Sequence, residues 1–307
     1  MPTLGIAALQ LDAARDGNLD LVEREIRSVA KRFPWVHLVV TGELAVHGPS
    51  LDKAEPAGGE TETRLQALAM ETGLWIVPGS LYEKRGDAIF NTTPVIDPRG
   101  KIVARYDKLF PFLPYEQGVA AGRHPVVFDI PGIGRIGIAI CYDMWFPEVI
   151  RTLAGMGAEV VLLPTMTNTI DRDVEVSIAR ANAAINQCSF VDVNLAGELG
   201  VGRSVVFGPG GDLVYEAGAG REVIALDIDL DEVRRVRARG WNGLGQVLKS
   251  FRDSEVAFPL HAHTDARRQY MQSLGPLDMP RRGETSHRAG DTADGEADRK
   301  PRLTIID

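Results

Sequence analysis

The fold expected for this chain is decided by one stretch, Arg135-Ile136-Gly137-Ile138-Ala139-Ile140-Cys141-Tyr142-Asp143-Met144-Trp145-Phe146-Pro147-Glu148. Its first part is β-branched, apolar or small and runs directly into Cys141, which is typical of a buried strand. Polar and aromatic residues follow, and Pro147 is placed where a helix starts. The stretch therefore predicts a buried strand, a sharp turn that carries the thiol, and a helix.

The thiol of Cys141 has two interpretations. At a strand end, close to the free amides of a helix start, it is well placed to act as a nucleophile. The commoner fate of a free cysteine is a place in the core. We assign that fate to Cys188, which lies at an expected transition from helix to strand. For Cys141, its own position does not decide between the two.

Composition narrows the class of protein. The chain has 307 residues, of which 44% are hydrophobic and 25% charged, as in an ordinary soluble globular protein. The net charge is −8 and no basic block occurs, so we expect neither a nucleic-acid partner nor binding to a membrane. Two cysteines make a disulfide framework implausible. Without a signal sequence or an apolar run of membrane-spanning length, we expect a cytoplasmic protein.

Strand, helix and hairpin patterns alternate along the chain. Expected strands cover residues 5–11, 36–40, 74–77, 88–96, 101–106, 126–130, 135–140, 160–163, 189–194, 204–207, 213–216 and 222–227. Expected helices cover residues 61–72, 146–156, 173–187 and 230–239, besides one that Asn18 caps. Mixing β-α-β units with hairpins predicts an α/β fold, in which two mixed sheets pack face to face with helices outside.

The domain organisation is expected to be simple. Residues 1–280 form one domain, in which residues 241–280 are a C-terminal arm. Beyond Pro280 the chain is polar and has little apolar periodicity. We therefore expect a disordered tail over residues 281–307.

Three local patterns point to chemistry that their context does not favour. The segment 132–137 matches G-x-G-x-x-G, but its glycines precede a strand instead of opening a helix, so we expect no dinucleotide cofactor. The nearest metal pattern, His261-Ala262-His263, lies in an expected loop, and we expect no metal. Asn91-Thr92-Thr93 fits a glycosylation acceptor, which we attribute to chance in a chain without a secretion signal.

A thiol nucleophile needs a base, and two residues at strand ends are candidates for its partners. None of the six histidines can be tied to Cys141 by a local signal. Glu43 follows an expected strand, as Cys141 does, and the carboxyl ends of parallel strands share one edge of a sheet. Lys108 ends the hairpin that the expected strands over residues 88–96 and 101–106 form around Asp97-Pro98-Arg99-Gly100, where a solvated surface lysine is the simpler interpretation.

Three separated motifs resemble the carbon–nitrogen hydrolase (nitrilase) superfamily. They are Thr41-Gly42-Glu43-Leu44, Arg105-Tyr106-Asp107-Lys108-Leu109-Phe110 and the stretch from Gly137 to Glu148, and the resemblance runs over roughly residues 3–255. It implies a four-layer α-β-β-α sandwich that dimerises through its helices, with the C-terminal arm on the partner subunit. It also implies a catalytic triad of Glu43, Lys108 and Cys141, with Glu116 as the family's second glutamate.

The resemblance also implies a reaction. Glu43 accepts the thiol proton, the thiolate of Cys141 attacks an amide or nitrile carbon, and Lys108 stabilises the oxyanion together with the amide N–H of Tyr142. Water activated by Glu43 then hydrolyses the thioester. We therefore expect a hydrolase that cleaves a non-peptide C–N bond of a small linear amide and releases ammonia or an amine. No cofactor is expected, and the assembly is a homodimer or a higher homo-oligomer.

The substrate stays open. Cys141-Tyr142-Asp143 resembles the amidase-like branches, whereas true nitrilases more often have Cys-Trp-Glu. Relatives that act on dicarboxylate monoamides or carbamoyl compounds often have arginine at the position of Trp145. This departure indicates a neutral, apolar or aromatic acyl group, unless Arg172 or Arg203 supplies a charge.

Further pocket candidates and alternative activities complete the prediction. The expected oxyanion and substrate-binding residues are Tyr142, Trp145, Thr165 and Met166, with Met144 as a further wall residue. The alternative enzymes are a nitrilase, an N-carbamoyl hydrolase, or an acyltransferase in which an amine or thiol captures the thioester. A binding protein without catalysis is the alternative outside the enzymes, and the complete catalytic set argues against it.

Overall fold

The computed structural model of the chain describes residues 3–113, 115–258, 271, 274–275 and 277. The chain divides into two compact units, Met1–Phe258 and Pro259–Asp307. All strands and helices given below belong to the first unit, which contains the expected arm only as far as Phe258. The predicted tail over residues 281–307 and the pair His261 and His263 lie outside the described residues.

The larger sheet has nine strands in the order β17-β1-β3-β5-β7-β6-β4, with β8 and β9 also paired to β7. Its strands are β1 (Thr3–Gln10), β3 (Leu38–Thr41), β4 (Glu55–Pro56), β5 (Trp75–Val77), β6 (Leu81–Arg85), β7 (Ala88–Ile96), β8 (Ile102–Asp107), β9 (Val119–Ala120) and β17 (Glu222–Asp229). Strand β3 is parallel to β1 and β5, whereas β17 is antiparallel to β1. The sheet is therefore mixed, as predicted.

The second sheet has six strands in the order β10-β11-β12-β13-β15-β16. They are β10 (Val126–Ile130), β11 (Gly134–Ile138), β12 (Val160–Pro164), β13 (Ser189–Val193), β15 (Val205–Phe207) and β16 (Leu213–Glu216), while β2 (Asp12–Ala13) pairs with β14 (Ala196–Gly197) in a small separate sheet. Strands β10 and β11, which correspond to the expected strands over residues 126–130 and 135–140, pair as an antiparallel hairpin. The G-x-G-x-x-G segment is thus a turn followed by a strand.

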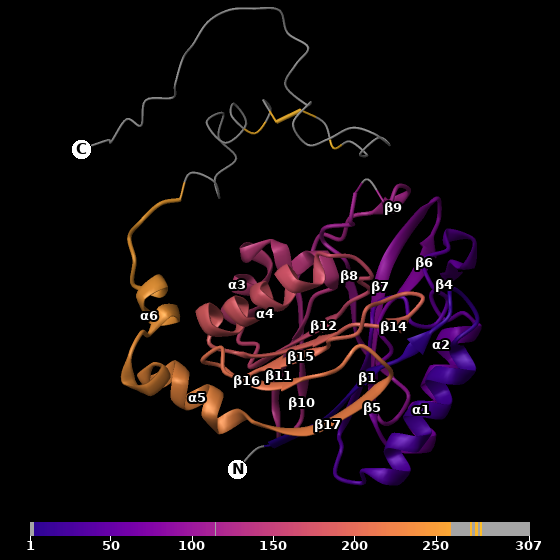
Figure 1. Cartoon of the computed structure of the whole chain (residues 1–307), viewed down its shortest axis with the longest axis horizontal. Helices are drawn as coiled ribbons and strands as arrows, with labels where there is room; N and C mark the ends of the chain where they lie inside the picture. Colours follow the sequence, from indigo (N-terminus) through magenta and orange to yellow (C-terminus); the bar gives the residue numbers. More distant parts are fainter. Residues whose placement is uncertain (1–2, 114, 259–270, 272–273, 276, 278–307) are drawn as a thin grey trace, which may run out of the picture. The chain divides into compact units, whose positions relative to one another are not determined.

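Helices cover the outer face of each sheet (Figure 1). Helices α1 (Leu19–Arg32) and α2 (Glu60–Thr72) cover the larger sheet, and α3 (Pro147–Gly155) and α4 (Arg172–Asn186) cover the second. The other helices are α5 (Leu230–Arg239), α6 (Val247–Arg252) and the 3-10 helices η1 (Leu51–Lys53), η2 (Cys141–Trp145) and η3 (Trp241–Gly243). Among the described residues, none of the helices combines the length and apolarity needed to cross a bilayer.

Alternating side chains on the strands separate three apolar cores. Ile6 on β1 and Leu162 on β12 belong to one core, which lies between the two sheets. Their neighbours Ala7 and Leu163 point the other way, Ala7 toward α1 and α2 and Leu163 toward α3 and α4. Two sheets that share a core and carry helices outside form the predicted α-β-β-α sandwich.

Some local expectations are confirmed and others are wrong. Cys188 is fully buried, and burial raises the pKa of its thiol to about 12, as fits a structural residue. Asn18 stands at the N-cap position of α1 but does not cap it, because its side chain binds the backbone of Ala14 instead. Strand β6 was not expected. The turn predicted to carry the thiol is a 3-10 helix that begins at Cys141, and the α-helix starts at Pro147 as expected.

Candidate active site

Glu43 is the second residue after strand β3, at the carboxyl end that the sequence predicted. Its backbone N–H donates to the carbonyl oxygen of Thr165, 3.1 Å away, at the end of β12 in the other sheet. The preceding residue, Gly42, is approached so closely by Gly79 that a Cβ at Gly79 would lie 1.7 Å from the Gly42 carbonyl oxygen. Gly79 has a φ of 77°, which glycine adopts without strain. Glu43 is therefore fixed where the ends of the two sheets meet.

Lys108 follows strand β8 and is the centre of a buried cluster of charged groups. Its Nζ lies 2.7 Å from Oε1 of Glu43 and 2.7 Å from Oε2 of Glu116. Its backbone N–H donates to the carbonyl oxygen of Asn91 on the neighbouring strand β7. The simpler interpretation of Lys108 as a surface residue is wrong, because the hairpin register turns its side chain into the interior.

Asn91 was not predicted, yet it connects the same two carboxylates. Its Nδ2 donates to Oε1 of Glu43 at 2.8 Å and to Oε1 of Glu116 at 3.0 Å. Asn91 is fully buried in β7, which is incompatible with a glycosylated surface site in the folded protein. The carboxylates of Glu43 and Glu116 are thus held by two shared donors, one charged and one neutral.

Cys141 begins η2 in the left-handed region, with a φ of 45°. A residue other than glycine is strained there and is retained only where its surroundings impose the conformation. Asp143 supplies that constraint, because its Oδ2 accepts from the backbone N–H of Ile140 at 2.9 Å and from the hydroxyl of Tyr106 at 2.6 Å. Its Oδ1 accepts from the backbone N–H of Phe110 at 2.9 Å. Asp143 therefore fixes the turn that carries the thiol, through hydrogen bonds from Ile140 before the turn and from Tyr106 and Phe110 in another part of the chain.

Burial and charge determine the protonation of the cluster. Burial raises the pKa of Glu43, and Lys108 and a hydrogen bond with Cys141 offset part of that rise. Burial and the nearby Glu43 raise the pKa of the Cys141 thiol well above its usual value, while Lys108 opposes them. Burial alone would lower the pKa of Lys108, but the charge of Glu43 and its neighbours raises it well above its usual value. The resting cluster therefore holds a neutral thiol beside a charged lysine, and the ionised Glu43 binds a proton more strongly than an ordinary glutamate does.

The thiol opens onto a cavity of about 370 Å³. Residues that line it include Phe112, Tyr142, Trp145, Met166, Thr167 and Glu175. Three of the predicted pocket residues, Tyr142, Trp145 and Met166, therefore lie at the cavity. Thr165 lies elsewhere, since its buried hydroxyl donates to Oδ1 of Asp192 at 2.8 Å. Met144 is buried in the core between the second sheet and its helices.

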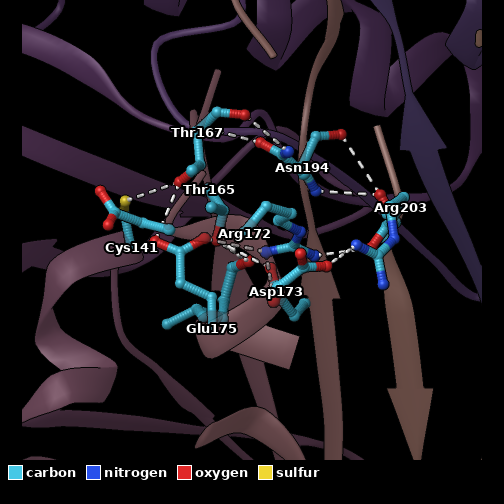
Figure 2. A network of polar contacts seen from close by, with 12 residues as sticks. Cys141, Thr165, Thr167, Arg172, Asp173, Glu175, Asn194 and Arg203 are labelled. Atoms are coloured by element: carbon cyan, nitrogen blue, oxygen red, sulfur yellow. Dashed lines mark hydrogen bonds and ion pairs between the residues drawn. The ribbon is translucent and has the colours of Figure 1, made fainter. Parts of the chain in front are cut away.

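A second buried network starts at the thiol and reaches the first turn of α4 and strand β13 (Figure 2). The sulfur of Cys141 lies 3.9 Å from the hydroxyl of Thr167, which donates to Oε1 of Glu175 at 3.0 Å. The guanidinium of Arg172 binds Oε2 of Glu175 at 3.2 Å and Oδ2 of Asp192 at 2.8 Å. Sequence reasoning missed Thr167 and Glu175, which no motif marks.

Neither arginine proposed as an anion-binding group lies at the cavity. Arg172 is buried between two carboxylates and also donates to the backbone carbonyl of Arg203. The guanidinium of Arg203 pairs with Asp173 and Glu216. Both positive charges are therefore neutralised by groups of the chain itself.

Comparison with known proteins places this geometry in a family. The family model described as carbon-nitrogen hydrolase matches residues 5–238, and the chain belongs to that family. It is 27% identical to the 2-oxoglutaramate amidase of Bacillus subtilis over 242 residues, which cover 76% of this chain and 93% of that protein. It is 30% identical to a nitrilase of Pyrococcus abyssi over 255 residues, covering 78% and 92%. Among solved structures, Nit3 of Saccharomyces cerevisiae, a member of the nitrilase superfamily, matches with a TM-score of 0.71 at 27% identity, covering 77% of this chain and 94% of that one.

Proposed function

We propose that the chain is a thiol-dependent hydrolase, in which Cys141 attacks a small amide and cleaves its non-peptide C–N bond. The observation that carries the proposal is that Glu43 and Glu116 both bind the buried ammonium of Lys108, while the thiol of Cys141 faces a cavity. Membership of the carbon-nitrogen hydrolase family supports it.

The first half of the reaction forms a thioester. Glu43 accepts the thiol proton as the sulfur of Cys141 attacks the amide carbon, and the ammonium of Lys108 stabilises the negative charge that develops on the carbonyl oxygen. The backbone N–H of Tyr142 is the second donor to that oxygen. The C–N bond then breaks, and Glu43 returns the proton to the departing ammonia or amine.

The second half restores the enzyme. Glu43, again a carboxylate, removes a proton from a water molecule that attacks the thioester carbon. The C–S bond breaks, the acid leaves, and the proton returns to the sulfur. Glu116 and Asn91 act as positioning residues, because they hold Lys108 and Glu43 in place.

A substrate screen tests the proposal. Aliphatic, aromatic and carbamoyl amides and nitriles are assayed for ammonia release with the wild-type chain, Cys141→Ala and the control Cys188→Ala. We expect an amide to be hydrolysed by the wild-type and Cys188→Ala chains and not by Cys141→Ala. Turnover that survives in Cys141→Ala contradicts the proposal.

The products distinguish the alternative activities that use the same thiol. Mass spectrometry of the quenched reaction is expected to show the acyl group attached to the peptide that contains Cys141. A nitrile or carbamoyl compound as the best substrate identifies the corresponding branch of the superfamily. A new amide that forms only when a second amine is added identifies an acyltransferase instead of a hydrolase.

A further inference from the structure

One wall of the cavity beside Cys141 is acidic. Glu175 and Asp171, both at the start of α4, line it, and no lysine or arginine is among the described residues that do so. The contacts through Thr167 place Oε1 of Glu175 within about 7 Å of the sulfur of Cys141. A substituent a few bonds from the carbonyl of an amide bound at the sulfur would therefore come within reach of this carboxylate.

The charge on this wall is not fully neutralised by the chain. Arg172 is the guanidinium that binds Glu175, and Asp192 shares it at the shorter distance of 2.8 Å. All three side chains are buried. Burial raises the pKa of Glu175, the charge of Asp192 raises it further, and Arg172 offsets only part of that rise. Two buried carboxylates with one counterion favour a second cation.

The remaining walls suit a cation better than an anion. Phe112, Tyr142 and Trp145 line the cavity, with ring centroids 4.9 Å apart between Phe112 and Tyr142 and 6.3 Å apart between Tyr142 and Trp145. The faces of aromatic rings attract ammonium groups and repel carboxylates. Trp145 stands where relatives that bind a carboxylate often have an arginine, so that positive charge is missing here. Glu175 instead places a carboxylate at the cavity, which attracts a cation.

We propose that the cavity selects amides whose acyl group carries an ammonium a few bonds from the carbonyl, with Glu175 and Asp171 as its counterions. The inference rests on the proposed function, since it names the substrate class of the same site. It replaces the neutral acyl group that Trp145 alone indicated.

Three amides of similar size test the charge preference. They are 4-aminobutanamide with an ammonium, pentanamide with a methyl group, and succinamate with a carboxylate. With the wild-type chain at neutral pH, we expect kcat/KM for the ammonium amide to exceed that for pentanamide by about tenfold or more. Succinamate is expected to be the poorest of the three, because its carboxylate faces Glu175.

Variants assign the preference to residues. We expect Glu175→Gln and Asp171→Asn each to lower the ratio of kcat/KM between 4-aminobutanamide and pentanamide, mainly through a higher KM for the ammonium amide. Asp173→Asn is the matched control, because Asp173 lies on the same turn of α4 but pairs with Arg203 outside the cavity. It is expected to keep the wild-type ratio.

The outcomes separate this inference from the proposed function. A wild-type ratio of one or less, or an unchanged ratio in both Glu175→Gln and Asp171→Asn, overturns the inference. If Cys141→Ala is inactive in the same experiment, the proposed function stands while the charge preference falls. If Cys141→Ala remains active, the proposed function itself falls. Competitive inhibition by butylammonium and not by butanol gives an independent check on the wild-type chain, which does not depend on the folding of any variant.

Discussion

The Nζ of Lys108 and the Oε1 of Glu43 lie 2.7 Å apart, although their side chains are only 1% and 3% exposed. A buried ion pair costs free energy of desolvation and persists only where the remaining hydrogen-bonding groups are satisfied. Here Glu116 accepts a second bond from the ammonium, and Asn91 donates to Glu43. The burial of this ion pair costs free energy of desolvation, so its role in the proposed reaction explains its presence better than a contribution to stability does.

Removal of the ammonium should lower activity strongly and weaken the fold. Lys108→Met leaves Glu43 and Glu116 buried without a counterion, so we expect a loss of about 3–5 kcal/mol in the free energy of unfolding. The loss of a donor to the oxyanion should lower kcat by about 10²-fold or more. Urea unfolding and ammonia release measure the two effects. Lys53→Met, which removes an exposed pair with Asp16, is the control and should change stability by less than about 1 kcal/mol.

Activity should fall on the acid side at a higher pH than an ordinary glutamate would give. Glu43 must be a carboxylate to accept the thiol proton, and burial raises its pKa above the usual 4.5. As pH falls through the raised pKa, the protonated fraction grows and kcat/KM declines. Lys108 gives no alkaline loss near neutral pH, because its pKa is raised and it keeps its charge. A profile of kcat/KM against pH checks both limbs, and an acid limb at or below 4.5 contradicts the assignment of Glu43 as the base.

Tyr106 should stabilise the turn that carries the nucleophile. Tyr106→Phe removes the 2.6 Å bond to Asp143, whose pKa burial raises to about 6, so its carboxylate form becomes harder to keep. We expect a loss of about 1–3 kcal/mol in the free energy of unfolding, with a larger loss at pH 8 than at pH 5 because protonated Asp143 tolerates burial better. Denaturant unfolding at the two pH values measures this. Tyr215→Phe, an exposed tyrosine, should show little change at either pH.

The hydroxyl of Thr167 should orient the sulfur of Cys141. Thr167→Val removes the contact with the sulfur and the donor to Glu175, while Thr167→Ser keeps both. We expect roughly a tenfold loss of kcat in Thr167→Val and near wild-type values in Thr167→Ser. The rate of alkylation of Cys141 by iodoacetamide as a function of pH gives a second readout. An identical pH profile in both variants would show that Thr167 acts only through packing.

The C-terminal arm should contribute to a dimer, as the resemblance to the superfamily implied. Leu244 beside η3 and Phe251 on α6 are exposed apolar side chains in the part of the arm that the structure describes. We expect Leu244→Asp or Phe251→Asp to shift the protein toward monomer in light scattering. Leu213→Asp, an exposed apolar residue of strand β16 that belongs neither to a helix nor to the arm, serves as the control. A wild-type monomer contradicts the prediction.

The sequence predicts those parts of the site that are tied to a single element. Glu43 and Cys141 follow buried strands, which apolar periodicity indicates. The expectation of one shared sheet edge was wrong, because β3 and β11 belong to different sheets, and the packing of the two sheets face to face brings these strand ends together. The side-chain direction of Lys108 was not, because it depends on the register between β7 and β8. The role of Asn91 depends on the same pairing.

The acidic wall was harder still to foresee. Which face of α4 meets the cavity is determined by packing against the second sheet, so no local signal marked Glu175. Thr165 was expected at the substrate because it follows a strand, and the structure turns its hydroxyl toward Asp192 instead. Tertiary packing decided both cases.

The burial of Asn91 has a practical consequence for making the protein. Asn91-Thr92-Thr93 is an acceptor sequence, and an enzyme that glycosylates the chain before it folds would meet it exposed. An oligosaccharide on that nitrogen could not be accommodated beside Glu43 and Glu116, so the modified chains would not reach the native state. Production in a secreting eukaryotic host should therefore yield misfolded, glycosylated material, whereas a bacterial host without that modification avoids the problem.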